Sequence, residues 1–287
     1  MRAARFHGKR DIRVEDIEEP FPKDGQVLVD VEWTGICGSE LHEYTMGPML
    51  TPTKPHPLTG ECIPITLGHE LCGRVRNPPP GSSLREGEPV MVDPRIHCGS
   101  CRPCSSNLTA CCETLGYVGG STGGGYGEQV AVAETSLYPL GNIPLDFAAV
   151  IEPLAVVHHA VKESNVKDWS SKSVLVLGGG PIGFAMLLDL MAHGVTKIIV
   201  SEPATIRRKQ VADLAQAVID PTKEDVSDRC RELTNGRGVD VVFDCAGVPV
   251  GLDAGFASLA YEGVYIMVAV WEKPVRLSCS NDVNRWY

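Results

Sequence analysis

Four closely spaced cysteines in the first half of the chain are the clearest group of residues that could do chemistry. Cys98, Cys101 and Cys104 are followed, after seven further residues, by Cys112. Thiolates are soft ligands, and four of them at short spacing match a closed, tetrahedral zinc site. Such a site leaves no coordination position for a substrate, so we expect its zinc to be structural. Cys111 is an alternative fourth ligand.

A second set of possible metal ligands is dispersed along the first half of the chain: Cys37, His69 with the adjacent Glu70, and Glu152. A catalytic zinc needs about three protein ligands and one open position, which a cysteine, a histidine and a carboxylate can supply. Spacing alone does not bring these residues together. Taken singly, Cys37 is typical of a small buried hydrophobic residue, His69 of a hydrogen-bonded core residue and Glu152 of an acid at a helix N-terminus.

A glycine-rich turn in the second half has the context of a dinucleotide-binding site. An apolar, β-prone run (173–177) leads into Gly178, Gly180 and Gly183, and a helix-compatible stretch follows. In such a turn the first glycine permits a tight bend, the second lets the backbone approach a pyrophosphate, and the third allows the helix to pack closely on the strand. A second β-prone run ends at Glu202, nineteen residues past Gly183, where a carboxylate can accept hydrogen bonds from the adenine ribose.

The charge of Glu202 bears on the choice of cofactor. A carboxylate there repels a 2′-phosphate, so the sequence favours NAD over NADP. Arg207 and Arg208 oppose this preference, because either side chain can reach a 2′-phosphate; the alternative is that they form a solvated helix face. A glycine-rich turn that binds no nucleotide is the alternative for the motif as a whole, but strand, helix and acid together favour binding.

The overall charge and the cysteine pattern disfavour several classes of function. Lys and Arg total 26 against 36 Asp and Glu, a net charge of -10 with no basic patch, which disfavours nucleic acid as a partner and a zinc ribbon that binds it. No apolar stretch approaches the ~20 residues that cross a bilayer. The start of the chain is charged rather than signal-like, so a secreted disulfide framework is disfavoured and we expect a cytoplasmic protein without a membrane partner.

The two halves of the chain differ in pattern, which predicts two domains. Residues 1–154 are rich in Pro, Gly and Cys and carry short β-prone runs, such as 26–33 and 127–132, which is typical of an irregular, mostly β domain. Residues 155–287 alternate apolar runs with helical stretches, which predicts an α/β domain with a doubly wound parallel sheet. The five strands expected in that sheet are 173–177, 197–201, 217–219, 239–243 and 264–268.

Together these motifs resemble the zinc-dependent medium-chain dehydrogenases, and most closely the branch of 2,3-butanediol and sorbitol dehydrogenases. The resemblance covers essentially the whole chain and is carried, in this order, by Gly35-Ile-Cys37-Gly-Ser39-Glu-Leu-His42, Leu67-Gly-His69-Glu70, the four cysteines, Glu152-Pro-Leu, Val176-Leu-Gly-Gly-Gly-Pro-Ile-Gly183 and Val200-Ser-Glu202-Pro. It implies a GroES-like catalytic domain followed by an NAD-binding Rossmann domain. A glutamate at position 152, rather than a cysteine, indicates the polyol and diol branch.

The resemblance also implies roles for the residues of the first domain. The ligands of the catalytic zinc would be Cys37, His69, Glu70 and Glu152, with the two glutamates bound directly or through water. Cys112, rather than Cys111, would complete the structural zinc site. Ser39 would hydrogen-bond the alcohol and His42 would pass its proton toward solvent.

For the second domain the resemblance implies a cofactor site and a reaction. The cofactor-binding residues are then Gly178, Gly180, Pro181, Ile182, Gly183, Glu202, Arg207 and Cys245. The implied reaction is hydride transfer between NAD and a secondary alcohol, vicinal diol or polyol, with zinc as the Lewis acid. A zinc-free quinone reductase is disfavoured, because that branch lacks the metal-binding residues.

The chain departs from the family pattern after its last expected strand. The family continues beyond 264–268 with a further strand and helix, and residues 278–287 do not match that continuation. We therefore expect a Rossmann domain that lacks its final strand and has an exposed sheet edge. The family is homo-oligomeric, but this strand builds the subunit contact, so a dimer is not implied here. The alternative function is a truncated, catalytically inactive relic that binds zinc and NAD.

Overall fold

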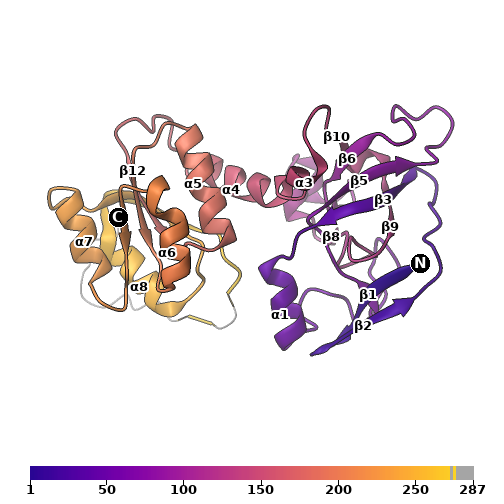
Figure 1. The fold of residues 1–287 in the computed structure, drawn as a ribbon, viewed down its shortest axis with the longest axis horizontal. Helices are drawn as coiled ribbons and strands as arrows, with labels where there is room; N and C mark the ends of the chain where they lie inside the picture. The colour runs from indigo at the N-terminus through magenta and orange to yellow at the C-terminus, as the bar shows by residue number, and fades with distance from the viewer. Residues whose placement is uncertain (272–273, 276–287) are drawn as a thin grey trace. The chain divides into compact units, whose positions relative to one another are not determined.

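The chain forms two compact units, Met1–Glu152 and Pro153–Tyr287. The structure, a computed structural model, describes residues 1–271 and 274–275 (Figure 1). The segment 278–287, on which one of the expectations above rests, lies outside the described residues.

The first unit is built mainly from β-strands. Its largest sheet has the strand order β10-β6-β5-β3-β9, with bounds Leu137–Pro139, Pro89–Val92, Leu71–Arg76, Gln26–Thr34 and Gln129–Ala133. A second sheet has the order β2-β1-β4, with bounds Asp11–Asp16, Arg2–Gly8 and Ile65–Thr66, and a third pairs β7 (Arg95–Ile96) with β8 (Gly116–Tyr117). All pairs in these sheets are antiparallel. The short helical segments are α1 (Gly38–Met46), α2 (Arg102–Ser105), η1 (Thr109–Cys111), η2 (Glu134–Ser136) and α3 (Leu145–Ala148).

Alternation of side chains explains the core of this unit. In β3, Val27 and Val29 are fully buried, and they share a hydrophobic cluster with Val75 of β5 and Val130 and Val132 of β9. Successive residues of a strand point to opposite faces, so residues two apart contribute to the same core. The expected strands at 26–33 and 127–132 are thereby confirmed, with boundaries at most two residues away from those expected.

The second unit contains one parallel sheet with the order β13-β12-β11-β14-β15. The strand bounds are Ala217–Ile219, Lys197–Ser201, Ser173–Leu177, Val239–Asp244 and Leu259–Met267. Counted along the chain, the order is 3-2-1-4-5, which is the order of the first five strands of a Rossmann sheet. The predicted α/β fold with a doubly wound parallel sheet is confirmed.

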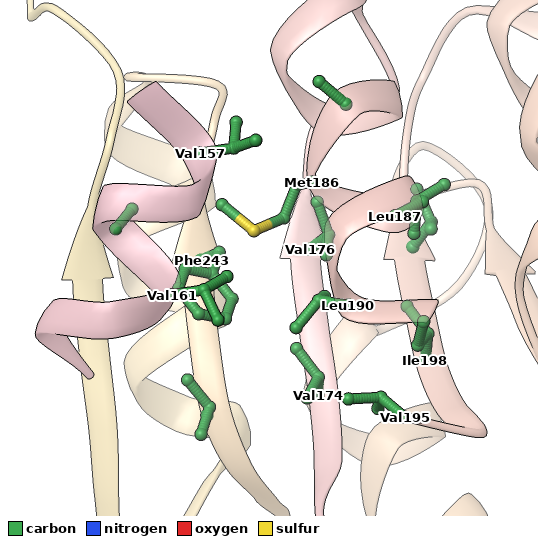
Figure 2. Close-up of a cluster of buried hydrophobic side chains, with 14 of the residues drawn as sticks. Val157, Val161, Val174, Val176, Met186, Leu187, Leu190, Val195, Ile198 and Phe243 are labelled. Atoms are coloured by element: carbon green, nitrogen blue, oxygen red, sulfur yellow. The ribbon is translucent and has the colours of Figure 1, made fainter. Parts of the chain in front are cut away.

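Helices precede the first strand of this sheet and connect the later ones. They are α4 (Ile151–Glu163), which begins before the division between the units, α5 (Pro181–Ala192), α6 (Thr205–Val211), η3 (Ala212–Leu214), α7 (Val226–Leu233) and α8 (Pro249–Ser258). Figure 2 shows the core that α4 and α5 share with the sheet: Val157 and Val161 come from α4, Met186 and Leu190 from α5, and Val176 from β11. All these side chains are almost completely buried, so the two helices are firmly packed.

The strand β15 is an edge strand of the part of the sheet that the structure describes. It pairs with β14 on one side, and none of its nine residues is fully buried. By contrast, all five residues of the central strand β11 are buried. The described helices include none that is both long and apolar enough to cross a membrane.

Candidate functional site

The four cysteines of the short loop between β7 and β8 come together in the structure. Cys98, Cys101, Cys104 and Cys112 form a group whose sulfur atoms all lie within 4.8 Å of one another. The sulfur atoms of Cys98 and Cys104 are 4.0 Å apart, and those of Cys101 and Cys112 are 3.9 Å apart. A tetrahedral zinc with Zn–S bonds of about 2.3 Å requires sulfur atoms about 3.8 Å apart. The residues present therefore fit a structural zinc.

Backbone hydrogen bonds favour the thiolate form of Cys98 and Cys112. The N–H groups of Ser100 and Cys101 donate to Cys98 Sγ at 3.5 and 3.3 Å, and the N–H of Cys98 donates to Cys112 Sγ at 3.3 Å. Hydrogen bonds from Ser100 and Cys101 lower the pKa of Cys98 to about 5. Cys111 is exposed and lies outside the group, so the structure selects Cys112 from the two alternatives.

The dispersed ligands Cys37, His69 and Glu70 also come together. One donor atom of each lies within 4.8 Å of the others, and both His69 and Glu70 are buried. Cys37 is the N-cap of α1, while His69 and Glu70 directly precede β5. The backbone pairs these segments, because the N–H of Gly35 donates to the carbonyl of Glu70 at 2.7 Å. A Cβ at position 35 would overlap the Glu70 carboxylate, so a larger residue there would displace the Glu70 side chain.

A buried carboxylate that the sequence interpretation did not single out holds this donor set together. Glu40 is 6% exposed; its Oε2 accepts hydrogen bonds from the N–H of Cys37 at 3.0 Å and from the Tyr126 hydroxyl. Its other oxygen, Oε1, lies 3.1 Å from Nδ1 of His69, although the angle is not that of a hydrogen bond. Histidines that bind metals commonly turn their second ring nitrogen to a carboxylate. The position of Glu40 therefore fits a metal at His69.

The electrostatics of the set also fit a cation. Burial opposes the charged form of His69, but the neighbouring Cys37 and Glu40 outweigh it and raise the pKa of His69 to about 10. Burial raises the pKa of Glu70, and His69 counteracts this only in part. Metal binding requires a deprotonated thiol, a neutral imidazole and a carboxylate, so a divalent cation would take the place of the protons that Cys37, His69 and Glu70 otherwise bind.

The remaining predicted residues of the first unit are Glu152, Ser39 and His42. Glu152 is not one of the three grouped donors, yet the charges of His69 and Glu70 act on it. Burial raises the pKa of Glu152 to about 7, with a further contribution from Glu70. Ser39 and His42 are three residues apart on α1 and partly buried, so they share one face of that helix.

The glycine-rich turn lies at the carboxyl end of β11, next to the reversal of strand order between β11 and β14. Ligands of doubly wound sheets bind at such a position. Gly178 has a φ of +93°, Gly180 is the N-cap of α5, and Pro181 and Ile182 form the first turn of that helix. The amino end of α5 therefore begins directly after the turn, as phosphate binding requires.

The acid at the end of β12 is tied to the glycine-rich turn. Glu202 is 2% exposed, and its carboxylate accepts hydrogen bonds from the N–H groups of Gly179 at 2.8 Å and Ala204 at 2.7 Å. Arg208 donates to the carbonyl of Glu202 and forms an ion pair with Asp220 at 2.8 Å. Arg207 is more exposed and lies 4.0 Å from the Glu202 carboxylate. Of the two arginines, Arg208 is thus the one already engaged within the protein.

Cys245 follows β14 at the same edge of the sheet. Its N–H donates to the carbonyl of Leu177 at 2.9 Å, and a Cβ on Gly178 would lie 3.4 Å from its carbonyl carbon. Burial raises the pKa of this thiol, which disfavours a thiolate. The structure thus brings Gly178, Glu202 and Cys245 to the ends of three adjacent parallel strands.

The β-rich first unit holds a closed four-thiolate set and an open set of three donors, and the second unit is a Rossmann sheet with a glycine-rich turn. This combination defines a zinc dehydrogenase of the alcohol dehydrogenase class. Two family models match the chain: the alcohol dehydrogenase GroES-like domain at residues 23–142 and the zinc-binding dehydrogenase domain at residues 181–285. The chain belongs to the zinc-dependent medium-chain dehydrogenase family.

Several relatives are similar over almost the whole chain. The (R,R)-butanediol dehydrogenase of Bacillus subtilis is 39% identical over 287 residues, which cover 99% of this chain and 81% of that protein. The corresponding enzyme of Neisseria gonorrhoeae is 37% identical, with 99% and 82% covered. The crystal structure of 2R,3R-butanediol dehydrogenase from Bacillus subtilis has a TM-score of 0.88 at 38% identity, with 96% of this chain and 79% of that chain covered. A zinc-binding dehydrogenase from Sinorhizobium meliloti, bound to NADP, has a TM-score of 0.85 at 29% identity, with the same shares covered.

Proposed function

We propose that this chain is an NAD-dependent zinc dehydrogenase that acts on a secondary alcohol, a vicinal diol or a polyol. The observation that carries the proposal is the set of Cys37, His69 and Glu70, whose donor atoms lie within 4.8 Å of one another. Three protein donors leave a coordination position for the substrate, whereas the four-cysteine set does not. Similarity to proteins named (R,R)-butanediol dehydrogenases supports the diol branch.

Two residues of α1 are proposed to remove the proton of the alcohol hydroxyl. Zinc held by Cys37, His69 and Glu70 would polarise the alcohol oxygen, and bound NAD would accept the hydride. Ser39 hydrogen-bonds the alcohol hydroxyl, and His42, three residues later on the same helix face, passes the proton toward solvent. Glu70 and Glu152 are the two carboxylates that compete for the position beside Cys37 and His69.

The preference for NAD is assigned to Glu202. Its buried carboxylate lies beside the glycine-rich turn, so a 2′-phosphate placed there meets a negative charge. Arg207 is the side chain that can oppose this effect, because Arg208 is held by Asp220. We further infer a cytoplasmic location, since the thiolates of the structural zinc set stay reduced in that compartment.

The test is NADH formation by the purified chain, followed by absorbance with NAD and a panel of 2,3-butanediol, sorbitol, xylitol and simple secondary alcohols. Zinc content is counted in parallel. Cys37→Ala should abolish activity and remove one zinc, and Ser39→Ala should lower kcat by about 10²–10⁴-fold with zinc retained. Cys111→Ala is the matched control, since this exposed cysteine lies outside both donor sets.

The same experiment separates the two candidate functions. A folded chain that binds zinc and NADH but oxidises none of these alcohols would support the inactive relic instead. A chain whose activity survives Cys37→Ala unchanged would contradict the assignment of the catalytic zinc.

A further inference from the structure

A third group of metal-binding side chains lies in the second unit, on α4 and α5. His158 Nδ1 lies 3.0 Å from Asp189 Oδ1, and His193 Nε2 lies 3.6 Å from Asp189 Oδ2. The donor atoms of all three residues lie within 4.8 Å of one another. The two imidazole rings are nearly parallel, with centroids 5.8 Å apart and an angle of 13° between their planes. One carboxylate thus faces two imidazoles.

The scaffold under this group is rigid. Asp189 and His193 are four residues apart at the end of α5, so they lie on one face of the helix. His158 comes from α4, whose adjacent residue Val157 is fully buried in the core shared with α5 (Figure 2). Packing of the two helices therefore fixes the separation of the three side chains without a ligand.

One carboxylate oxygen of the group is buried without a hydrogen bond. Asp189 Oδ2 is buried and makes no hydrogen bond among the described residues, although Oδ1 of the same carboxylate contacts His158. A buried carboxylate oxygen without a donor is costly, because it has lost its water. A cation between Asp189 and His193 would satisfy this oxygen. The orphaned atom is therefore an observation independent of the clustering.

We propose that His158, Asp189 and His193 bind a divalent transition-metal ion, with Zn²⁺ as the occupant. Two imidazole nitrogens and one carboxylate oxygen are borderline ligands that suit zinc rather than calcium or magnesium. The side chain of His158 is 60% exposed and that of His193 is 37% exposed, so water completes the coordination and the ion exchanges with solvent. This site shares no residue with the Cys37 and Cys98 donor sets and does not depend on the proposed dehydrogenase function.

The chain contains its own reporter and its own control for this site. Trp169 lies 6.4 Å from His193, centroid to centroid, so paramagnetic Ni²⁺ bound there quenches its fluorescence. His159, next to His158 on α4, is 67% exposed and lies outside the group, where it faces Glu163 at 3.9 Å. His159→Gln is therefore the matched control for His158→Gln.

The experiment uses the full chain with its other zinc sites loaded. Zinc bound after equilibrium dialysis is counted for the wild type, His158→Gln, His193→Gln and His159→Gln, and Ni²⁺ titrations follow tryptophan fluorescence in the same proteins and in Trp169→Phe. We expect His158→Gln and His193→Gln each to lose one zinc per chain and the Ni²⁺-dependent quenching. His159→Gln should behave as wild type, and Trp169→Phe should lose the quenching.

Two results would overturn the proposal. Equal zinc counts in all four proteins would show that the group holds no ion and is a His–Asp–His contact only. Quenching that survives in both His158→Gln and His193→Gln would place the Ni²⁺ elsewhere. Because the His158 side chain is mostly exposed, its substitution leaves the core intact; a melting temperature measured without added metal verifies this.

Discussion

The closely spaced glycines Gly180 and Gly183 provide a test of how the second unit prepares a dinucleotide site. A Cβ built on Gly183 would lie 1.9 Å from the carbonyl oxygen of Gly178, whereas real Cβ atoms essentially never come within 3.0 Å of another heavy atom. Helix α5 and the turn must then move apart by about 1 Å, against a close-packed core. The N–H of Gly178 is itself bonded to Ser201 at 2.8 Å, so the turn cannot move freely.

The expected cost of Gly183→Ala follows from these contacts. Overpacking costs about 1–3 kcal/mol, and the obstacle here is backbone rather than a flexible side chain, which places the cost at the upper end. The better helix propensity of alanine offsets about 1 kcal/mol. We therefore expect the free energy of unfolding to fall by about 2 kcal/mol and the melting temperature by roughly 4–8 °C.

Gly180→Ala is the matched control, because the same change meets no obstacle there. The nearest heavy atom to a Cβ at position 180 is the Arg207 side chain at 3.6 Å, and φ is −74°, which any residue adopts. Stability should change by no more than about 1 kcal/mol. The added methyl group instead occupies space that the pyrophosphate needs, so the Kd for NADH should rise at least about tenfold, or about 1.4 kcal/mol.

Urea unfolding followed by circular dichroism measures the first effect, and NADH fluorescence titration measures the second. The reasoning is refuted if Gly180→Ala destabilises the chain more than Gly183→Ala does. It is also refuted if Gly180→Ala binds NADH as tightly as the wild type.

Three further predictions concern single side chains. Asp225 caps α7 by accepting a backbone hydrogen bond at 2.9 Å, so Asp225→Ala should lower the free energy of unfolding by about 1 kcal/mol in urea titrations, and an unchanged midpoint would contradict this. Glu40 contacts His69 and bonds Cys37, so Glu40→Gln should weaken zinc binding by about 10–100-fold in a competition with a chromophoric chelator, with the helix content unchanged. Burial raises the pKa of Asp240, but hydrogen bonds from Ser173 outweigh it and lower the pKa below its usual value. The ionised Asp240 carboxylate therefore stabilises the fold above the unfolded-state pKa, and this stabilisation is lost as the pH falls through the folded-state pKa. The melting temperature of Asp240→Asn should consequently depend less on pH than that of the wild type between about pH 5 and pH 3. Identical pH profiles of the two proteins would count against this.

The strands of the second unit were predictable because their signal is local. Apolar runs bounded by turns mark parallel strands that are buried on both faces, and 173–177, 197–201 and 217–219 coincide with β11, β12 and β13. The last strand was placed too late, since β15 begins at Leu259 rather than at 264. Its early residues include Tyr261 and Glu262, both exposed, so they lack the apolar signal by which the other strands were found.

The metal-binding groups differ in how far their ligands are separated along the chain. The four-cysteine set lies within one loop, so spacing alone indicated it, and only the choice between Cys111 and Cys112 required the fold. Cys37 and His69 are joined by the pairing of Gly35 with Glu70, which no local pattern reveals. The family resemblance instead implies that Cys37 and His69 share one zinc.

Where neither spacing nor resemblance carried a signal, the sequence interpretation missed the residue. An acid three residues into a helix is ordinarily part of a capping box, as Glu40 is here, so its position in the sequence reveals no second role. Only the fold shows that this carboxylate also contacts His69 and Tyr126 while being almost fully buried. The pairing of Asp189 with His193 is visible as a four-residue spacing on a helix, but such pairs are common on exposed helices. The pair becomes a candidate metal site only because α4 packs on α5 and places His158 beside Asp189. That packing depends on the apolar faces of the two helices and not on the metal-binding side chains.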